Sequence, residues 1–475
     1  MMWHFNFGQN IAIIDENGAE ITYAELKDAC DKLVSQTNGR SLVFILCANK
    51  KGSVLGYTAF LNGGLVSLLL DADLERGLID KLINIYKPDY LWIPQSLSER
   101  FADFSVTSSA WGYTLLKTPY NKIFPLHKEL ALLLTTSGSI GSPKLVRQSY
   151  INIRANTESI VEYLEIDCRE RSITTMPMSY TYGLSIINSH LWVGASVILT
   201  EKTLMQKEFW RQLNEYAATS FGGVPYIYEM LNKLRFFNMD CPSLRIMTQA
   251  GGKLSPKLHR EFAEHAAKNG KKFIVMYGQT EATARMSYLP AHKSLEKYGS
   301  VGIAIPRGVL TLIDSRGDEI GVSETVGELI YKGANVTLGY AENGADLAKG
   351  DERGGVLKTG DMAKRDTDGF YYIVGRKTRF LKIFGNRVNL DEIEQLLRSA
   401  FEGFDYACVG VDDKMKIYIA NAKKTDEEYS SLSVLSKDII KFLTDKTGFN
   451  HAAFETVIIE SIPRGESGKI SYGKL

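Results

Sequence analysis

A loop rich in hydroxyl groups follows the apolar run at residues 130–134, and its composition suits the binding of a phosphate chain. Its glycines let backbone N–H groups approach an anion closely, its hydroxyls add hydrogen-bond donors, and its lysine supplies positive charge. The spacing is not the G-x-x-x-x-G-K-[ST] pattern of a P-loop NTPase. By itself, such a loop is more typical of a polar surface turn between strands. The candidate ligand-binding residues in it are Thr135, Ser137, Gly138, Ser139, Gly141 and Lys144.

A second candidate group is the segment Tyr-Gly-Gln-Thr-Glu at residues 277–281, which follows a strand-like run at 273–276. The end of a strand is where α/β sheets place their ligands. Tyr277 offers an aromatic face, Thr280 a hydroxyl, and Glu281 a carboxylate of the kind that Mg²⁺ prefers. The alternative for this segment is a capped loop that buries a tyrosine and binds nothing.

Asp361, Arg376 and Lys469 are three further candidate residues. Asp361 follows Thr-Gly in a turn, where its carboxylate can accept hydrogen bonds from both hydroxyls of a ribose. Arg376 has five fixed donors, which suit ribose and phosphate oxygens. By itself, Asp361 is more typical of a turn residue bonded to its own backbone, and Lys469 of a solvated tail.

The order of these motifs resembles the adenylate-forming superfamily of acyl-CoA synthetases, carrier-protein ligases and luciferases. The loop at 135–144 has the Ser/Thr/Gly-then-Pro-Lys form of that superfamily's phosphate loop, and the resemblance spans nearly the whole chain. Each motif is modest, but the joint order is specific, so the chain is identified as a member. The order continues through Ala250-Gly251-Gly252, residues 277–281, Gly327-Glu328-Leu329, Thr359-Gly360-Asp361, Gly375-Arg376, Lys382, Gly385 and residues 463–469.

The resemblance implies a role for each matching residue. Thr280 would contact the α-phosphate, Glu281 would hold Mg²⁺, and Lys469 would bridge the substrate carboxylate and the α-phosphate during adenylation. After adenylation the small domain would rotate and present the face with Lys382 and Gly385 to the incoming thiol. The residues that the resemblance assigns to nucleotide binding are the 135–144 loop, Gly251, Gly252, Tyr277, Asp361 and Arg376.

The hinge of this rotation departs from the superfamily pattern. Thr378 stands where relatives commonly carry Asp or Lys, and Arg379 stands where an acidic residue is frequent. Rotation of the small domain is therefore still expected, but the chemistry of its hinge is left open.

The substrate pocket also departs from the pattern, in the segment at residues 177–183. Tyr180 stands where many acyl-activating relatives have His, and amino-acid-activating relatives have Asp at or beside that position. Neither Tyr180 nor Thr181 is acidic, and an ammonium group buried without a partner is costly, which disfavours an α-amino acid as substrate. We expect Tyr180 and Tyr182 to lie in the substrate pocket.

Hydrophobic patterning predicts the elements that position these residues. The alternation of strand-like and helical runs predicts α/β layers with largely parallel sheets, formed by a large ATP- and acid-binding domain at residues 1–376. The apolar stretch 55–70 is too short and too interrupted for a membrane span and predicts a buried helix that leads into a strand. The strand-like runs lie at 41–46, 89–93, 172–175, 195–199 and 273–276, and the helical patterns at 23–34 and 256–268.

The pattern changes after an Asp/Gly turn at residues 366–369. Asn389 and Glu392 predict a capping box at the start of a helix whose apolar face contains Leu390 and Leu397. These elements predict a small, mobile α+β C-terminal domain at residues 377–475. Its other expected elements are strands at 370–374, 406–411, 416–420 and 456–459 and a helix near 435–444.

Charge and cysteine usage limit the partners and the compartment. Lys and Arg number 56 against 55 Asp and Glu, a net charge of +1, so neither nucleic acid nor an anionic membrane is expected as a partner. The five cysteines are scattered without CxxC spacing, which argues against a disulfide framework and a zinc site and favours a reducing cytoplasm. The first residues also lack the basic start and apolar run of a signal peptide.

The sequence therefore predicts a ligase that uses ATP and Mg²⁺ to activate a small carboxylic acid as an acyl-adenylate. The acyl group would pass to a thiol, with coenzyme A as the first choice and the phosphopantetheine of an acyl carrier protein as the second. An alternative from another class is a non-catalytic nucleotide-binding protein that kept the scaffold, which Thr378 and Arg379 would permit. The presence of Lys469, Glu281 and Asp361 argues against that alternative.

Overall fold

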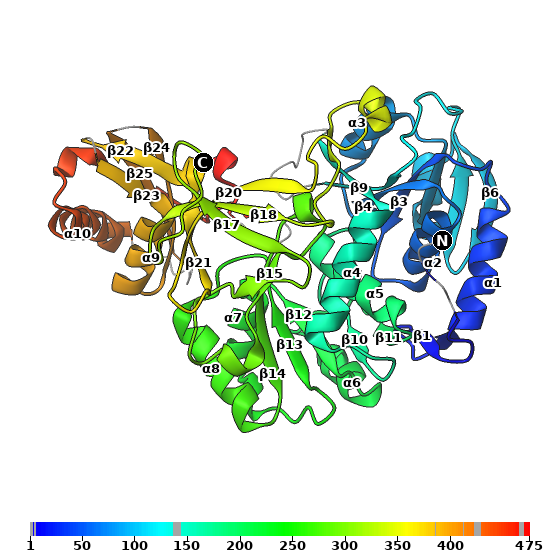
Figure 1. The fold of residues 1–475 in the computed structure, drawn as a ribbon, viewed down its shortest axis with the longest axis horizontal. Helices are drawn as coiled ribbons and strands as arrows, with labels where there is room; N and C mark the ends of the chain where they lie inside the picture. The colour runs from blue at the N-terminus through cyan, green and yellow to red at the C-terminus, as the bar shows by residue number, and fades with distance from the viewer. Residues whose placement is uncertain are drawn as a thin grey trace. The chain divides into compact units, whose positions relative to one another are not determined.

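The computed structural model describes residue 3 and residues 6–135, 144–384, 386–411, 413–421, 429–464 and 470–475. The side chains of residues 378, 380, 382, 386, 387, 421 and 429–434 lie outside this description. One compact unit comprises Met1–Leu310 and Tyr331–Leu357, and the other comprises Thr311–Ile330 and Lys358–Leu475 (Figure 1). The expected boundary at 376/377 lies inside the second unit, and it stays a prediction.

The first sheet of the first unit runs in the order β16-β15-β14-β13-β12-β10-β11-β1-β2. Its strands from β14 to β1 are parallel, whereas β2, β15 and β16 run antiparallel to their neighbours. The predicted parallel arrangement is therefore confirmed for the centre of the sheet. The bounds are β1 Ile11–Ile14, β2 Glu20–Thr22, β10 Arg171–Ile173, β11 Ser196–Ile198, β12 Ser220–Gly223, β13 Ile246–Gln249, β14 Lys272–Tyr277, β15 Ser287–Tyr288 and β16 Ile303–Ala304.

The second sheet of this unit runs in the order β19-β9-β8-β4-β3-β5-β7-β6. Again the centre, from β8 to β5, is parallel and the edges are antiparallel. The antiparallel edges were not evident from the sequence, because the direction of a strand depends on which strands become its neighbours in the fold. The bounds are β3 Leu42–Cys47, β4 Val66–Asp71, β5 Tyr90–Pro94, β6 Ser105–Ala110, β7 Tyr113–Lys117, β8 Leu130–Thr135, β9 Leu145–Ser149 and β19 Gly339–Ala341.

Helices of the first unit lie between and around its two sheets. Between the sheets, α4 contacts β8 and β9 of the second sheet, and α5 contacts β10 and β11 of the first. The predicted bounds of α1 and α8 are confirmed, since Thr22 and Glu25 form a capping box and Ser255 caps α8 ahead of a proline at its first turn. The bounds are α1 Tyr23–Val34, α2 Lys51–Asn62, α3 Arg76–Tyr86, α4 Tyr150–Leu164, α5 Thr181–Trp192, α6 Lys207–Glu215, α7 Pro225–Lys233 and α8 Pro256–Lys268.

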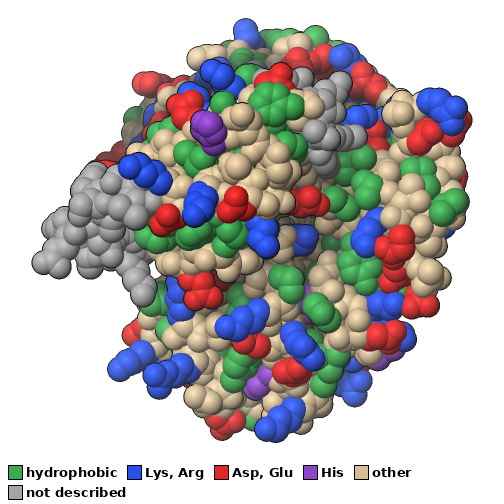
Figure 2. All heavy atoms as spheres, turned by 90° about the vertical axis from the view of Figure 1, so that its left-hand side faces the viewer, with side chains coloured by type: hydrophobic (Ala, Val, Ile, Leu, Met, Phe, Trp, Pro, Cys, Tyr) green, Lys and Arg blue, Asp and Glu red, His purple; other side chains and the backbone are tan. Residues whose placement is uncertain are grey.

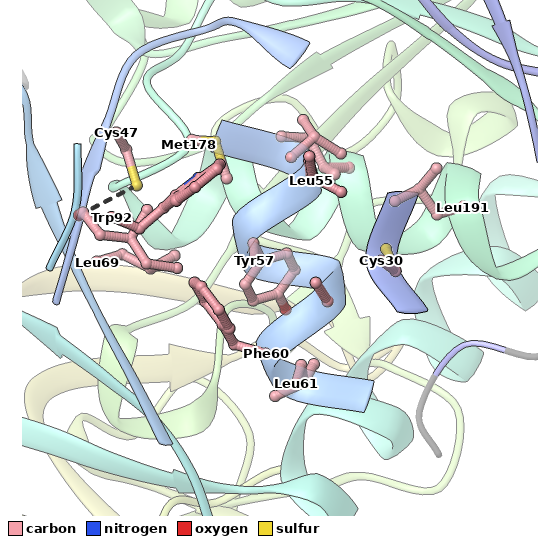
Figure 3. Close-up of a cluster of buried hydrophobic side chains, with 14 of the residues drawn as sticks. Cys30, Cys47, Leu55, Tyr57, Phe60, Leu61, Leu69, Trp92, Met178 and Leu191 are labelled. Atoms are coloured by element: carbon pink, nitrogen blue, oxygen red, sulfur yellow. Dashed lines mark hydrogen bonds between the residues drawn. The ribbon is translucent and has the colours of Figure 1, made fainter. Parts of the chain in front are cut away.

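Helix α2 contributes Val54, Leu55, Tyr57, Ala59, Phe60 and Leu61 to a hydrophobic cluster of the first unit, and it leads into β4 as residues 55–70 predict. Figure 3 shows Tyr57 and Phe60 of this helix packed among side chains from neighbouring elements. A glycine permits this close packing, because a methyl group on Gly56 would lie 2.2 Å from the ring of Trp92. In the part of the chain that the structure describes, no helix combines the length and the apolar character needed to cross a membrane. All five cysteines are free thiols.

The second unit contains a sheet in the order β17-β18-β20-β21, a hairpin of β22 and β23, and a sheet in the order β24-β25-β26. Helix α9 packs on β24 and α10 on β26. Both the small α+β region and its order of elements agree with the prediction. The bounds are β17 Val309–Ile313, β18 Gly327–Lys332, β20 Val356–Arg365, β21 Tyr371–Arg376, β22 Phe380–Ile383, β23 Asn386–Asn389, α9 Leu390–Ala400, β24 Phe404–Val411, β25 Lys414–Asn421, α10 Tyr429–Thr447 and β26 Phe454–Ile459.

The start of α9 differs from the predicted capping box. The side chain of Asn389 accepts a hydrogen bond from the backbone N–H of Asp391 at 3.0 Å and donates to the carbonyl of Val374 at 2.8 Å. Asn389 is also the last residue of β23, where it pairs with Phe380. The helix therefore begins with an asparagine cap that ties it to β21, and no bond from Glu392 closes a box among the contacts of the described residues.

Arg379 joins this cap to the rest of the second unit. Its guanidinium pairs with Asp391 at 2.7 Å and with the buried Glu394 at 2.5 Å. The same group lies 3.7 Å from the centre of the Tyr472 ring, and Tyr472 donates a hydrogen bond to Glu394. Arg379 is therefore held by α9, which carries both carboxylates.

Surface charge agrees with the balanced composition. In the view of Figure 2, basic and acidic side chains are interspersed over the visible face. Ion pairs between exposed side chains occur in the described residues. An example is Lys27–Asp31, whose partners lie one helical turn apart on α1.

Candidate active site

The two ends of the 135–144 loop lie side by side. Thr135 ends β8 and Lys144 precedes β9, and these strands pair antiparallel with Thr135 opposite Leu145. The predicted ligand-binding residues Ser137, Gly138, Ser139 and Gly141 lie outside the described residues. The loop is thus a connection between adjacent antiparallel strands.

Lys144 and Glu281 are linked by a tyrosine. The Lys144 ammonium lies 3.9 Å from the centre of the Tyr340 ring, and the Tyr340 hydroxyl donates a hydrogen bond to Glu281 Oε1 at 2.8 Å. Lys144 also lies 3.8 Å from the Glu342 carboxylate. Strand β19, which contains Tyr340, pairs with β9 next to the loop, so the sheet itself brings these groups together.

Arg353 completes this group from the other side of the tyrosine. Its guanidinium lies 4.6 Å from the centre of the Tyr340 ring. It donates hydrogen bonds to the Glu281 carbonyl at 3.0 Å and to the Thr337 hydroxyl at 2.9 Å. Burial and the adjacent Glu281 carboxylate raise the pKa of Tyr340 to about 12, so Tyr340 is a neutral donor near pH 7. Two cations and one carboxylate therefore converge on one aromatic ring.

The segment from Tyr277 to Thr283 forms a tight turn at the end of β14. A short 3-10 helix spans Thr280–Ala282, and Thr283 has φ of +66°. The Glu281 carbonyl accepts from the Thr337 backbone N–H at 3.0 Å, which fixes the turn to the neighbouring chain. Tyr277, Thr280 and Glu281 thus lie together at the end of a strand, as the sequence predicts.

Gly278 is the residue that this turn requires most strictly. A methyl group there would lie 1.7 Å from the Ala284 carbonyl oxygen, a backbone atom that cannot move aside. We expect Gly278→Ala to lower the free energy of unfolding by about 3 kcal/mol, because overpacking against backbone forces the turn to shift. Thermal and denaturant unfolding measure this change.

Gly77→Ala is the matched control for that experiment. Gly77 lies in α3, and a methyl group there meets no atom within 4 Å. Its replacement should leave stability unchanged or raise it by up to about 1 kcal/mol, since alanine favours a helix interior over glycine. Equal stability of the two variants would contradict the tight turn at residue 278.

Tyr180 and Tyr182 lie together at the start of α5, with ring centres 6.4 Å apart. The Tyr182 hydroxyl donates to the Thr248 carbonyl at 2.8 Å, and it accepts from the Gly223 N–H at 3.2 Å. Burial raises the pKa of both tyrosines, so both side chains are neutral.

The predicted Gly251 and Gly252 lie beside these tyrosines at the end of β13. Gly251 has φ of +83°, and a methyl group on it would lie 2.9 Å from the Tyr180 hydroxyl. The Gly252 carbonyl accepts from Gln249 at 2.9 Å, and Gly252 itself is exposed. The glycines thus leave room for the tyrosine and expose backbone at a strand end.

Asp361 and Arg376 form a pair within the second unit. Strands β20 and β21 set these residues opposite each other, and Arg376 Nε lies 2.9 Å from Asp361 Oδ1. Asp361 is buried and Arg376 is more than half exposed. Lys382 lies on β22 with its side chain outside the description, and Gly385 and Lys469 are outside the described residues.

The donor set limits which metal could bind. In the described ranges, no group of three or more His, Cys, Asp or Glu side chains could hold an ion. Magnesium is usually bound by one or two carboxylates together with substrate phosphates and water. The single carboxylate of Glu281 at the strand end suits an ion that is also coordinated by the phosphates of a nucleotide. It does not suit a metal bound only by protein side chains.

Tyr340, Arg353 and Arg285 are residues that sequence reasoning missed. Tyr340 and Arg353 reach Glu281 across 59 and 72 residues of chain. No local pattern signals such distant pairs. The pairing of β19 with β9 brings Tyr340 to the site, and the sequence pattern of such short strands does not predict which strands pair.

A family model described as AMP-binding enzyme matches residues 4–341. The chain belongs to this family. The chain is 29% identical over 349 residues to the peroxisomal OPC-8:0-CoA ligase 1 of Arabidopsis thaliana, and this alignment covers 72% of the chain and 63% of that protein. It is 26% identical to the oxalate–CoA ligase of Saccharomyces cerevisiae, with 73% of the chain and 63% of the relative covered. The chain thus spans less than two thirds of the length of these curated relatives.

A solved structure shows that the chain has a known fold. The o-succinylbenzoate coenzyme A synthetase of Bacillus subtilis, solved with ATP and magnesium ion, matches with a TM-score of 0.77 and 21% identity. That alignment covers 98% of the chain and 96% of the solved structure. The predicted architecture of a large N-terminal domain and a small C-terminal domain is confirmed by this likeness.

Proposed function

We propose that this AMP-binding enzyme is an acid–thiol ligase that activates a carboxylic acid with ATP and transfers the acyl group to coenzyme A. The observation that carries the proposal is the convergence of Lys144, Tyr340 and Glu281 at the base of the 135–144 loop. Two relatives at 26–29% identity are named as CoA ligases, which supports this acceptor.

The reaction would proceed by two displacements. A carboxylate oxygen of the acid attacks the α-phosphorus of ATP, the bond to the β-phosphate breaks, and pyrophosphate leaves. The thiolate sulfur then attacks the acyl carbon, and AMP leaves with the electrons of the broken C–O bond. Binding the acid and the nucleotide together supplies proximity, and fixed cations stabilise the charge that develops in the first step.

The residues of the chain divide these tasks. Lys144 and the loop donors would hold the terminal phosphates, Thr280 the α-phosphate, and Lys469 the developing charge between carboxylate and α-phosphate. Glu281 would bind Mg²⁺, which when bound neutralises phosphate charge. Nucleotide contacts are also proposed for Gly251, Gly252, Tyr277, Asp361 and Arg376, and acyl or thiol contacts for Tyr180, Tyr182, Lys382 and Gly385.

The second step is proposed to need a rotation of residues 377–475. A pivot at Thr378 is supported by the anchoring of Arg379, because the chain from Arg379 onward is tied to α9. Hydrogen bonds from Asn389 to Val374 and from the Arg376 N–H to Asp391 cross this pivot and would break during rotation. Each is a modest contact, which suits a hinge.

The acyl carrier protein is the second candidate for the thiol acceptor, and the cytoplasm is the proposed compartment. All five thiols are free, as expected in a reducing environment. The proposed acceptor can be tested by incubating the full chain with ATP, Mg²⁺ and a panel of acids, with and without coenzyme A, and measuring acyl-CoA by mass spectrometry. Acyl-CoA formation supports the proposal. Acid-dependent pyrophosphate release without acyl-CoA would exclude coenzyme A as the acceptor and favour the carrier protein, and absence of both products would refute the ligase function.

We expect Asp361→Ala to raise the KM for ATP by about 10-fold or more and to change the KM for the acid little. The proposed role is acceptance of ribose hydrogen bonds, and bonds to a charged group contribute about 1.5–3 kcal/mol. Steady-state pyrophosphate release at varied ATP and varied acid separates the two constants.

The control for Asp361→Ala is Asp318→Ala, an exposed carboxylate of the same unit. It should leave both KM values at the wild-type level. Because Asp361 is buried beside Arg376, thermal unfolding of Asp361→Asn checks that the pair is not needed for folding. Equal increases of both KM values in Asp361→Ala would mean that the carboxylate is structural.

A further inference from the structure

Arg285 is a buried arginine whose position is fixed from both sides. The residue is 3% exposed, and its backbone carbonyl accepts hydrogen bonds from the side-chain amides of Asn156 at 3.0 Å and Asn335 at 2.9 Å. The guanidinium lies 3.9 Å from the centre of the Tyr182 ring. Both main chain and side chain are therefore held in one place.

The charge of Arg285 has no counterion in the described part of the chain, where no carboxylate lies within ion-pair distance of it. Its Nε atom is buried and makes no hydrogen bond. The Tyr163 hydroxyl lies near the guanidinium, and it is a neutral group because burial raises its pKa. Burying a cation without a counterion costs free energy, because the charge loses its hydration. An anionic ligand that pairs with Arg285 would offset this cost.

Arg285 lines an interior cavity of the first unit. The cavity is small, and its wall is formed by α4, α5, β10, β12 and β13. Hydroxyl groups of Ser185 and Thr248 belong to the wall. Thr248 is also the residue that Tyr182 contacts, so the cavity and the proposed acyl residue Tyr182 share a neighbour.

The other titratable groups of the cavity do not neutralise Arg285. Glu170 is buried on the wall, but its carboxylate pairs with Arg245 at 2.7 Å. His190 is neutral because burial lowers its pKa, and its Nδ1–H donates to the Ile186 carbonyl at 2.8 Å. The charge that is left unmatched in the cavity is the positive charge of Arg285.

We propose that Arg285 binds a second carboxylate of the substrate, so that the acid activated by this enzyme is a dicarboxylic acid. This inference rests on the proposed ligase function and names its substrate class. A guanidinium presents parallel N–H donors that match the two oxygens of a carboxylate, and the free Nε belongs to that fork. A monocarboxylic acid with an alkyl end would leave the buried cation unpaired.

The test compares paired acids with the full wild-type chain. Each straight-chain dicarboxylic acid is assayed beside the monocarboxylic acid of equal carbon number, by pyrophosphate release with ATP and Mg²⁺. At the preferred length we expect kcat/KM to favour the dicarboxylic acid by about 100-fold, since a site built around a charged group rejects ligands that lack its partner. Equal kcat/KM values for the paired acids would overturn the proposal and leave the ligase function standing. Absence of turnover with every acid would instead refute the ligase function.

Two variants assign this preference to Arg285. Arg285→Met should lose about 100-fold in kcat/KM for the dicarboxylic acid, mainly through KM, and should use the monocarboxylic acid as well as before. Arg285→Lys keeps the positive charge but lacks the parallel N–H donors of a guanidinium, so it should retain an intermediate preference for the dicarboxylic acid. This variant provides the test if Arg285→Met does not fold. Arg260→Met, an exposed arginine of α8, is the control and should match wild type. A dicarboxylate preference that survives in both Arg285 variants would show that the arginine is structural.

Discussion

Replacing Lys469 with alanine is expected to slow adenylate formation by ~10²-fold or more. The lysine is proposed to neutralise charge that develops between the acid carboxylate and the α-phosphate. In a closed site of effective dielectric near 20, a cation about 4 Å from such a charge contributes ~4 kcal/mol, against ~1 kcal/mol in water. Acid-dependent pyrophosphate release in a single turnover measures the effect directly.

The second half-reaction separates this role from a general loss of structure. Lys469→Ala should form thioester from supplied acyl-adenylate at the wild-type rate, because the charge is needed only in the first step. Lys474→Ala removes an exposed lysine of the same terminal segment and should leave both half-reactions unchanged. Near-normal pyrophosphate release by Lys469→Ala would exclude the proposed role.

Proline at Thr378 is expected to leave adenylation largely intact and to reduce thioester formation by about 10²-fold. Proline fixes its own φ near roughly −65° and also restricts Lys377, so one orientation of residues 377–475 should be trapped. Arg379 strengthens this expectation, because its pairs with Asp391 and Glu394 prevent it from absorbing the rotation. Single-turnover assays of pyrophosphate release and of acyl transfer measure the two steps separately.

Thr367→Pro is the matched control for the hinge. Residue 367 is the second residue of a turn in which the Gly369 N–H donates to the Asp366 carbonyl, a position that accepts proline. This variant should keep both half-reactions. Thr378→Ala should keep them as well, because alanine leaves φ at residue 378 free to change. If Thr378→Pro retained wild-type rates in both steps, the pivot would have to lie elsewhere.

The sequence predicted the elements with strong local patterns. Helices α1 and α8 have both an amphipathic face and capping residues, and their bounds agree with the prediction. The apolar stretch 55–70 likewise became α2 and β4. The antiparallel edges of the sheets and the cap of α9 were not predicted, because they depend on which strands become neighbours. Asn389 bonds to Val374 only because β21 passes beside it.

The sequence predicted the motifs of the candidate site, but it did not predict the residues that connect these motifs in the fold. Lys144 and Glu281 were identified from their side-chain chemistry and from the resemblance, yet their connection through Tyr340 depends on the pairing of β19 with β9. Arg285 was not singled out either, since an arginine in a polar segment is usually exposed. Its burial without a counterion is a property of the folded cavity and has no signature in the local sequence.

The central claim, reversible activation of a carboxylic acid by ATP, is tested most directly by the exchange of labelled pyrophosphate into ATP without any thiol. The full chain with Mg²⁺, ATP and a panel of mono- and dicarboxylic acids should catalyse this exchange only when an accepted acid is present, and Lys469→Ala should lower the rate by ~10²-fold. Exchange that proceeds equally without acid, or that fails with every acid while the folded chain still binds ATP, would contradict the account.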